Sequence, residues 1–175
     1  MVRTGITPLA GVVGVARGLR AGGDLCGVAN LHDASALRAG GLDPPILILG
    51  PALPEERAAI NAGGFIPSVS SAAEAQAFAG NRSGINFAID TGMGRMGYWQ
   101  DEALAEFEKA AAIPGLKLPS VSTHLPAAAE DERFTEEELT RFAALVAQLP
   151  PRVAAPRQFQ CLPPAVSEGA PHIPV

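Results

Sequence analysis

The stretch Ile-Asn-Phe-Ala-Ile-Asp-Thr-Gly-Met-Gly-Arg-Met-Gly-Tyr-Trp, residues 85–99, joins a strand pattern to an unusual connection. Its first part, residues 85–89, is a short apolar run of the kind found in buried strands. The run ends in Asp-Thr, and glycines then alternate with two methionines and Arg95. A surface turn has no need of an arginine held between glycines, so the central question is what Arg95 faces.

Short apolar runs of this kind recur at roughly twenty-residue spacing, which is typical of strands that alternate with helices. The clear runs cover residues 25–29, 46–49, 65–69, 85–90 and 118–124, and a weaker run covers residues 153–159. They lack strict alternation of apolar and polar residues, which indicates strands buried on both faces.

Helical patterns lie between these runs. They cover about residues 8–21, residues 31–39 before a Gly-Gly pair, and segments that begin near residues 54, 71, 102 and 135. Ser71 with Glu74, and Thr135 with Glu138, have capping-box spacing, in which a hydroxyl and a carboxylate each bond a free backbone N–H. We therefore predict that Ser71 and Thr135 are helix N-caps.

The alternation predicts an α/β fold with a parallel sheet. A closed barrel needs about 250 residues, whereas this chain has 175, with five clear strands, one weak strand and no convincing strand before the helix at 8–21. An open doubly wound sheet and a solenoid are the alternatives, but no GxGxxG, P-loop or repeat consensus supports them. The alternation alone does not decide between an open sheet and a barrel, and a barrel of this length would be an unusual half-fold or a fragment.

Composition excludes several classes of function. The net charge of -5 gives no basic surface for nucleic acid, and no apolar run is long enough to span a membrane. Two cysteines, Cys26 and Cys161, make no disulfide framework. Residues 5–16 faintly resemble a signal peptide, but Pro8 interrupts them. A cytoplasmic protein without a metal site is the expectation.

Two polar groups follow successive clear strands. Residues 90–97, which include Arg95, follow one strand, and His124 ends the next. In a parallel barrel the catalytic face lies at the carboxyl ends of the strands, so the two groups can share a pocket. Arg95 could present its planar fork to a phenolate or carboxylate oxygen. The alternatives are a solvated arginine in a flexible connection and a structural, hydrogen-bonded histidine.

Residues 90–97, Asp-Thr-Gly-Met-Gly-Arg-Met-Gly, resemble the DTGM(G/N)R(L/M)G motif of the alanine racemase family. The likeness extends to Gly-Val-Ala-Asn at 27–30, to Pro-Ile-Leu-Ile-Leu-Gly at 45–50, and to the family's THF…T…Q…RF pattern over residues 122–142. It covers about residues 12–150. The arginine motif is specific, and the other segments support it by their order.

The resemblance implies a TIM-like barrel that holds pyridoxal 5'-phosphate (PLP) and is followed in the family by a β-rich C-terminal domain. We therefore expect residues 1–175 to form one domain, an incomplete TIM-type (β/α) barrel. Members are dimers that interconvert L- and D-alanine, which supplies D-alanine for peptidoglycan. By this resemblance Arg95 is expected to bind both the substrate carboxylate and the cofactor's phenolic oxygen. His124 is expected to lie against the cofactor ring.

The sequence also departs from the family. The Schiff-base lysine and the tyrosine of the family's K-A-(D/N)-A-Y-G motif fall on Thr4 and Pro8, and the two lysines of the chain, Lys109 and Lys117, lie in and just after a helix. Ala88 stands where many members have a carbamylated lysine. The second base, a tyrosine of the partner's C-terminal domain, is not matched within residues 1–175.

These departures predict that no residue of the chain is catalytic and that covalent attachment of PLP fails. We therefore expect a racemase-like chain that is inactive alone and pairs as a homodimer or with a complementing chain. The alternative is a non-catalytic module that binds PLP or an amino acid.

Overall fold

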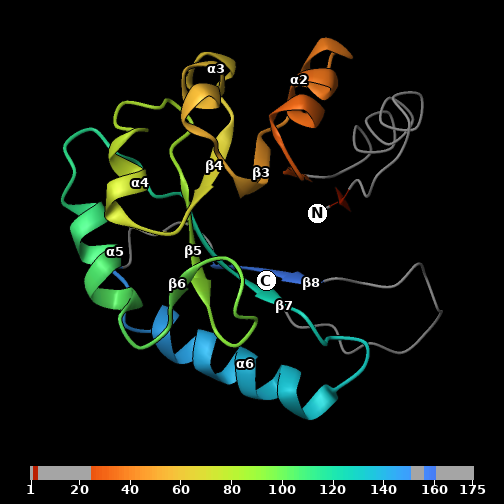
Figure 1. Cartoon of the computed structure of the whole chain (residues 1–175), viewed down its shortest axis with the longest axis vertical. Helices are drawn as coiled ribbons and strands as arrows, with labels where there is room; N and C mark the ends of the chain where they lie inside the picture. The colour runs from red at the N-terminus through yellow and green to blue at the C-terminus, as the bar shows by residue number, and fades with distance from the viewer. Residues whose placement is uncertain (1, 4–24, 151–155, 161–175) are drawn as a thin grey trace.

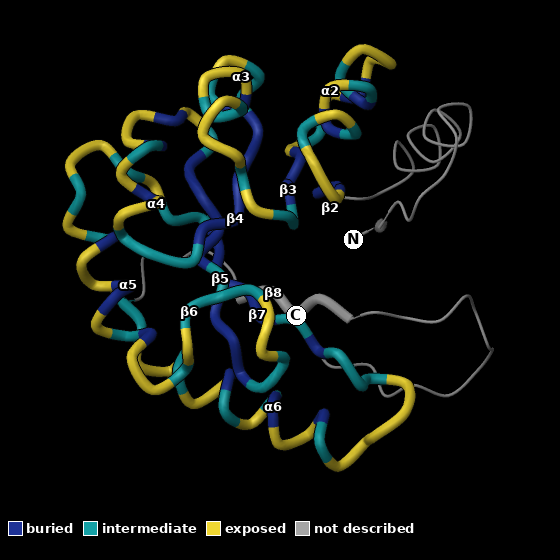
Figure 2. The backbone as a smooth tube through the Cα atoms, viewed as in Figure 1, coloured by how far each residue is buried: buried dark blue, intermediate teal, exposed yellow. Residues whose placement is uncertain are grey.

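A computed structural model describes residues 2–3, 25–150 and 156–160. Within these ranges parallel strands alternate with helices, as the spacing of the apolar runs predicts. Helices α2 to α6 follow one another around the outside of the strands, as Figure 1 shows. Buried residues concentrate in the strands and on the helix faces that meet them (Figure 2).

The strands are β1 (Val2–Arg3), β2 (Cys26–Val28), β3 (Ile46–Pro51), β4 (Ile66–Val69), β5 (Asn86–Asp90), β6 (Tyr98–Trp99), β7 (Ser120–Leu125) and β8 (Pro156–Gln160). They hydrogen-bond in parallel in the order β1-β2-β3-β4-β5-β7-β8, and the short β6 pairs with β5. Apart from the short β6, strands that follow one another along the chain are neighbours in this order, so the sheet grows in one direction, as in a barrel.

The helices are α2 (Leu31–Ala39), the 3-10 turn η1 (Pro54–Glu56), α3 (Arg57–Gly63), α4 (Ala72–Gln76), α5 (Ala103–Ala111) and α6 (Glu132–Val146). Each predicted helix from residue 31 onward is present, whereas the helix predicted at residues 8–21 lies outside the described residues. No helix in the described ranges has the length and hydropathy needed to cross a bilayer.

The prediction of an incomplete TIM-type barrel is confirmed. Among the described residues no pairing joins β1 to β8, so the sheet curls without closing. The six predicted strands correspond to β2, β3, β4, β5, β7 and β8. The expectation that no strand precedes the first helix was wrong, since Val2 and Arg3 pair with Cys26 and Gly27. A two-residue strand is too short to show a pattern, and only its pairing defines it.

One predicted helix cap is confirmed in part. Ser71 is the N-cap of α4, and its hydroxyl accepts a hydrogen bond from the Glu74 N–H at 3.2 Å. In a standard capping box the Glu74 carboxylate would accept from the N–H of the N-cap, Ser71. Here it accepts from the N–H of the preceding residue, Ser70, at 2.7 Å. The cap therefore ties down the turn before the helix as well as its first turn.

The cap predicted at Thr135 was wrong. Helix α6 begins at Glu132, and the N-cap is Asp131, whose carboxylate accepts from the Phe134 N–H at 2.9 Å. Thr135 lies inside the helix and donates its hydroxyl to the Asp131 carbonyl at 2.8 Å. Because Asp131 precedes a helix-compatible segment and caps as well as threonine does, the helix starts a full turn earlier. Glu138 is consequently free of any capping role.

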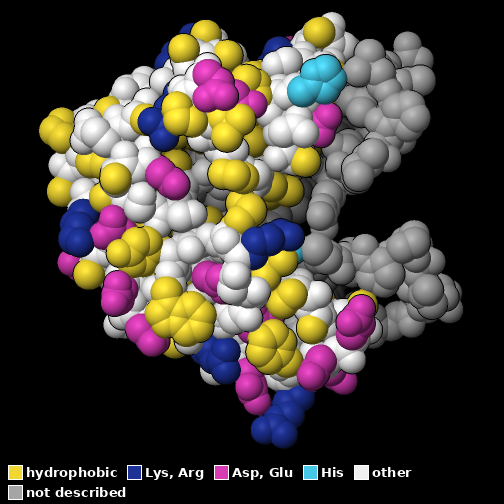
Figure 3. All heavy atoms as spheres, in the orientation of Figure 1, with side chains coloured by type: hydrophobic (Ala, Val, Ile, Leu, Met, Phe, Trp, Pro, Cys, Tyr) yellow, Lys and Arg dark blue, Asp and Glu magenta, His cyan; other side chains and the backbone are white. Residues whose placement is uncertain are grey.

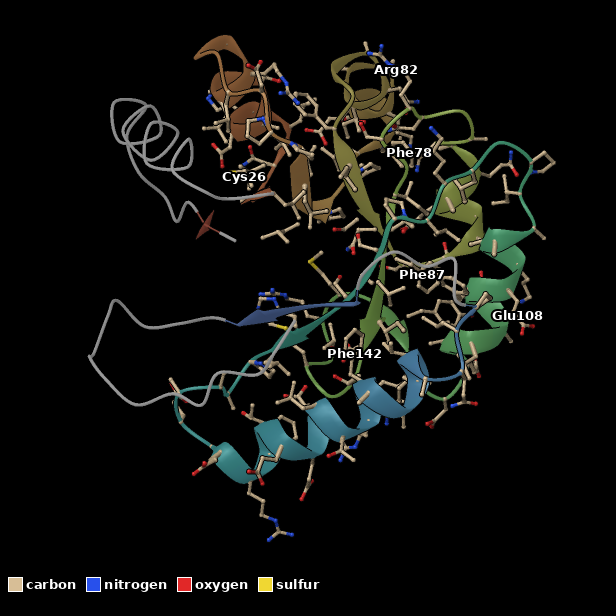
Figure 4. All side chains as sticks on the ribbon, turned by 180° about the vertical axis from the view of Figure 1, so that it is seen from behind. Cys26, Phe78, Arg82, Phe87, Glu108 and Phe142 are labelled. Carbon is tan, nitrogen blue, oxygen red and sulfur yellow. The ribbon has the colours of Figure 1, made fainter. Side chains whose placement is uncertain are left out.

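The main hydrophobic core lies between the outer face of the sheet and the helices. Phe87 on β5 meets Phe107 on α5 edge to face, with ring centroids 5.5 Å apart and an interplanar angle of 84°. Phe142 on α6 belongs to the same buried cluster. Figure 4, which views the molecule from behind, shows Phe87 and Phe142 between the sheet and helices α5 and α6.

The inner face of the sheet is apolar over β2 to β4 and polar around β5. Leu25, Leu47 and Ile66 form a separate cluster on β2 to β4. On β5 the amide of Asn86 donates to Ser68 at 3.1 Å and to Ser122 at 2.7 Å, and it accepts from Ser120 at 2.9 Å. All four of these side chains are buried. Alternation along β5 places Ala88 and Asp90 on this same polar face.

Candidate functional site

The Asp90 carboxylate organises the loop that carries Arg95. Asp90 ends β5 and is 6% exposed. One of its oxygens accepts from the Gly92 N–H at 2.9 Å, and the other accepts from the Arg95 N–H at 3.0 Å. A carboxylate that bonds two backbone N–H groups fixes both ends of the intervening turn. The backbone of Arg95 is thus held at the carboxyl end of β5.

Gly97 returns the chain to the strand from which the loop departs. The next two residues form β6, in which Tyr98 and Trp99 pair with Ile89 and Asp90. Gly97 has φ +109°, and a Cβ at this position would lie 2.6 Å from the Asp90 nitrogen. Only glycine permits so close an approach at this backbone angle. The loop is therefore a closed, strand-anchored structure, and the flexible connection considered from the sequence does not describe it.

The Arg95 side chain projects from this anchored loop. It is exposed, and it makes no hydrogen bond or ion pair with any residue that the structure describes. A guanidinium remains charged throughout the physiological pH range and binds carboxylate and phosphate oxygens in pairs. Its backbone is fixed while its charge is unpaired, which is the arrangement that an anion-binding side chain requires.

The carboxyl ends of β5 and β7 come together as the sequence predicts. The Thr91 hydroxyl lies 2.7 Å from the Thr123 hydroxyl, and both residues are buried. The strands pair with Ala88 opposite Ser122, and continuing this register places Asp90 level with His124. His124 is half-buried and lies on the face of β7 that carries Ser120 and Ser122. It is therefore on the polar inner side of the sheet.

Helix α6 clamps the start of the Arg95 loop from outside. The Arg141 guanidinium donates to the Thr91 carbonyl at 3.0 Å. Gly92 packs directly on this helix, because a Cβ at residue 92 would lie 3.0 Å from the Phe134 ring and 3.1 Å from a Glu138 oxygen. The loop is consequently fixed by β5, by β7 and by α6.

Glu138 is a buried carboxyl group that sequence reasoning did not recognise as part of the site. It is fully buried, and neither of its oxygens has a hydrogen-bond partner in the described part of the chain. Burial raises the pKa of Glu138 and the Asp90 carboxylate adds to this, while Arg141 and the Thr91 hydroxyl lower it. The sequence signal was its position between Thr135 and Phe142, the buried face of α6.

Both lysines of the chain lie away from the carboxyl ends of the strands. Lys109 sits on α5 with its side chain 67% exposed, and it bonds Glu106 at 2.9 Å. This hydrogen bond holds the pKa of the Glu106 carboxyl below its usual range. Lys117 precedes β7 and donates to the Arg82 carbonyl at 3.1 Å. It therefore lies at the amino end of the sheet, opposite the Arg95 loop.

The space-filling view gives the surroundings of these groups. Hydrophobic side chains gather across the middle of the face in Figure 3, between α3 and α6, with charged side chains around them. Leu53 and Trp99 are the large hydrophobic side chains most exposed in the described residues. No group of three or more His, Cys, Asp or Glu side chains suited to a metal ion occurs in the described ranges.

Residues 9–166 match the family model described as "Alanine racemase, N-terminal domain". The chain belongs to this family. The model's range includes β2 to β8 and therefore all of the site described above. Membership supports PLP as the cofactor implied by the sequence resemblance.

Curated alanine racemases align with most of this chain. That of Methylacidiphilum infernorum (isolate V4) is 34% identical over 157 residues, which are 82% of this chain and 40% of that protein. That of Desulforamulus reducens is 36% identical over 149 residues, which are 79% of this chain and 40% of that protein. The chain thus spans about 40% of the length of these relatives.

Solved structures confirm the fold. The alanine racemase of Clostridium difficile 630 superposes with a TM-score of 0.77 at 24% identity, over 83% of this chain and 41% of that one. A histidine racemase from Leuconostoc mesenteroides superposes with a TM-score of 0.69 at 22% identity, over 82% of this chain and 41% of that one. Since racemases of two different amino acids share this fold, the fold does not select the substrate.

The residues present fit PLP only in part. A Schiff base needs a lysine amine beside the cofactor, and Lys109 and Lys117 are both held elsewhere. The positions that match the family's lysine motif, Thr4 and Pro8, lie outside the described residues, and neither side chain has an amine. Arg95 and His124 nevertheless offer a cationic and an aromatic group on adjoining strand ends.

Proposed function

We propose that residues 1–175 form one barrel domain of alanine racemase type that binds PLP non-covalently and does not racemise alanine on its own. The observation that carries this proposal is the position of the two lysines, one on the outer surface of α5 and one at the amino end of β7. PLP as the cofactor is supported by the family membership. The assignment of binding groups is supported by the geometry of the Arg95 loop.

Racemisation requires more than cofactor binding. A proton must leave one face of the α-carbon and return on the other, so two bases are needed. PLP delocalises the negative charge that develops when the proton leaves. With the family's lysine position occupied by Thr4, this chain supplies no amine that could serve as the first base. A complementing chain that carries a lysine and a second base would have to provide the missing groups.

Arg95 and His124 are the residues that we assign to binding. The Arg95 guanidinium is exposed and unpaired among the described residues, and it would bind the phenolic oxygen of PLP and the carboxylate of an amino acid. His124 lies on the polar face of β7, where it would lie against the cofactor ring. Alanine as the amino acid, a cytoplasmic location and a role in D-alanine supply for peptidoglycan follow from the family and form part of this proposal.

A stand-alone binding module is the second candidate. It is favoured by the Asp90 bonds, which hold the Arg95 backbone in place whether or not any lysine is present. In this case the domain would bind PLP or a free amino acid without catalysing a reaction. Racemase activity that appears on mixing with a lysine-bearing partner would separate the first candidate from the second.

The expected effect of Arg95→Ala is a ten- to hundredfold rise in the Kd for PLP, because a hydrogen bond to a charged group contributes about 1.5–3 kcal/mol. Equilibrium dialysis with detection of PLP absorbance measures this. Arg133→Ala is the matched control, since Arg133 is an arginine with a 90% exposed side chain on α6. Equal affinity of both variants, or no binding by the parent chain, would contradict the assignment of Arg95.

A further inference from the structure

Glu138 has a setting that the proposed binding site does not explain. It is fully buried, and both carboxyl oxygens lack hydrogen-bond partners among the described residues. Buried polar side chains are almost always paired, because an unpaired buried group loses its hydration without compensation. Glu138 packs against the start of the Arg95 loop, since one of its oxygens lies 3.1 Å from the position that a Cβ on Gly92 would take.

The charged groups around Glu138 do not neutralise it directly. Arg141, one turn along α6, donates to the Thr91 carbonyl at 3.0 Å and to the exposed Glu137 at 3.4 Å. On the strand side the Asp90 carboxylate, which has the same sign as an ionised Glu138, raises the pKa of Glu138. The Thr91 hydroxyl also faces this region, and it lies 2.7 Å from the Thr123 hydroxyl.

The other titratable groups near the loop lie elsewhere. His124 on β7 is on the opposite face of that strand from Thr123, by strand alternation. The Arg95 side chain is exposed, and only its backbone is tied to Asp90. A neutral Glu138 therefore fits this environment, whereas an ionised one would be unpaired and next to a like charge.

We propose that Glu138 is protonated in the folded protein and is a positioning residue whose ionisation loosens the loop 90–97 that presents Arg95. Ionisation places a second negative charge beside Asp90 and against Gly92, the first loop residue that Asp90 holds. An ionised carboxylate must be hydrated. The packing of Gly92 on α6 keeps water away from it, so the loop has to move. The loop transition stands without any ligand, and only its consequence for PLP binding rests on the proposed function.

The direction of the pH dependence follows from the raised pKa of Glu138 in the folded protein. Its contribution to stability is complete at pH values below the usual range of glutamic acid. The contribution is lost as the pH rises through the raised value, because the folded state then resists the ionisation that the unfolded state permits. Between the ordinary and the raised pKa the closed state keeps a proton that the open state releases, so the population with the loop closed falls by at most about tenfold per pH unit, and the fall ends above the raised value.

The fluorescence of Trp99 reports on this loop without a ligand. Trp99 is the single tryptophan of the chain, and it lies in β6, which pairs with β5 directly after the loop. We expect its emission to change in one transition in the parent chain, at a pH above the usual range of glutamic acid. The transition should be absent in Glu138→Gln, whose amide has the shape of the protonated acid and cannot ionise.

A second variant removes the acid that is hydrogen-bonded to the reporter. The Trp99 indole donates to the Asp101 carboxylate at 3.1 Å, so Asp101→Asn is the matched control, and it should keep the transition. A parent chain with no transition, or a transition that persists in Glu138→Gln, would overturn the proposal. If Glu138→Gln fails to fold, infrared spectra of the parent chain decide, because a buried protonated acid keeps its carboxylic C=O band above the usual glutamate range and an ionised one loses it.

PLP affinity measured at both ends of the same pH range separates this proposal from the proposed function. Affinity that falls with the fluorescence transition in the parent chain and holds in Glu138→Gln supports both. A fluorescence transition without PLP binding at any pH overturns the proposed function and leaves the role of Glu138 in place.

Discussion

Replacing Gly97 by alanine is expected to lower the free energy of unfolding by about 2–4 kcal/mol and to abolish PLP binding. The backbone at residue 97 has φ +109°, and the added methyl carbon would lie 2.6 Å from both the Asp90 nitrogen and the Ile89 carbonyl carbon. These are backbone atoms of β5, so they cannot yield by a rotamer change. We expect β6 to separate from β5, and the Arg95 loop to lose the pairing that returns it to β5.

Gly94→Ala is the control for this prediction. Gly94 also has a positive φ, +70°, but no atom lies within 4 Å of the position of an added Cβ. It should therefore show only the conformational cost of about 1–2 kcal/mol. Chemical denaturation gives the stabilities, and dialysis gives the PLP affinities. Equal losses of stability in the two variants would show that the close approach of Gly97 to β5 is not what holds the loop.

Phe107→Ala is expected to lower the free energy of unfolding by about 3–5 kcal/mol, which is a large fraction of the stability of a domain of this size. Phe107 is 1% exposed and joins α5 to the sheet through its edge-to-face contact with Phe87. Removing the ring leaves a cavity between the sheet and α5 that the strand backbone cannot fill. Denaturant unfolding followed by circular dichroism measures the loss.

Phe107→Leu tests whether the ring contact matters beyond burial. Leucine retains much of the apolar area but loses the aromatic pair, which contributes about 0.5–1.5 kcal/mol. Its destabilisation should therefore be well below that of alanine. If the alanine variant unfolds within about 1 kcal/mol of the parent chain, the cluster around Phe87 is not the main core of the domain.

The fold was predictable from the sequence because its strands are buried on both faces. Runs such as residues 85–90 stand out as apolar blocks, and the helices between them have their own periodicity. The predictions from sequence failed where two local patterns compete and where no local pattern exists. Thr135 and Asp131 are both good caps, and only the folded chain shows that Asp131 takes the role. The strand Val2–Arg3 depends on pairing with β2, which no local pattern contains.

The sequence predicted only those site residues that lie at the end of a strand or directly after it. Residues 90–97 and His124 were placed at one edge of the sheet by the parallel order of β5 and β7, and the structure brings their strand ends together through Thr91 and Thr123. Glu138 was missed, because it reaches the loop from α6 across 46 residues of chain, counted from Gly92. Its burial is a tertiary property, and in the sequence it is one of three consecutive glutamates.

This chain is expected to hold PLP without a Schiff base. The most direct test is to incubate the chain with one equivalent of PLP, reduce with borohydride, and map modified lysines by mass spectrometry, with Lys109→Arg and Lys117→Arg as controls. We predict no lysine labelled in proportion to bound PLP, and PLP that dialyses away from unreduced protein. Stoichiometric labelling of Lys109 or Lys117 that is lost in the matching arginine variant would contradict the account.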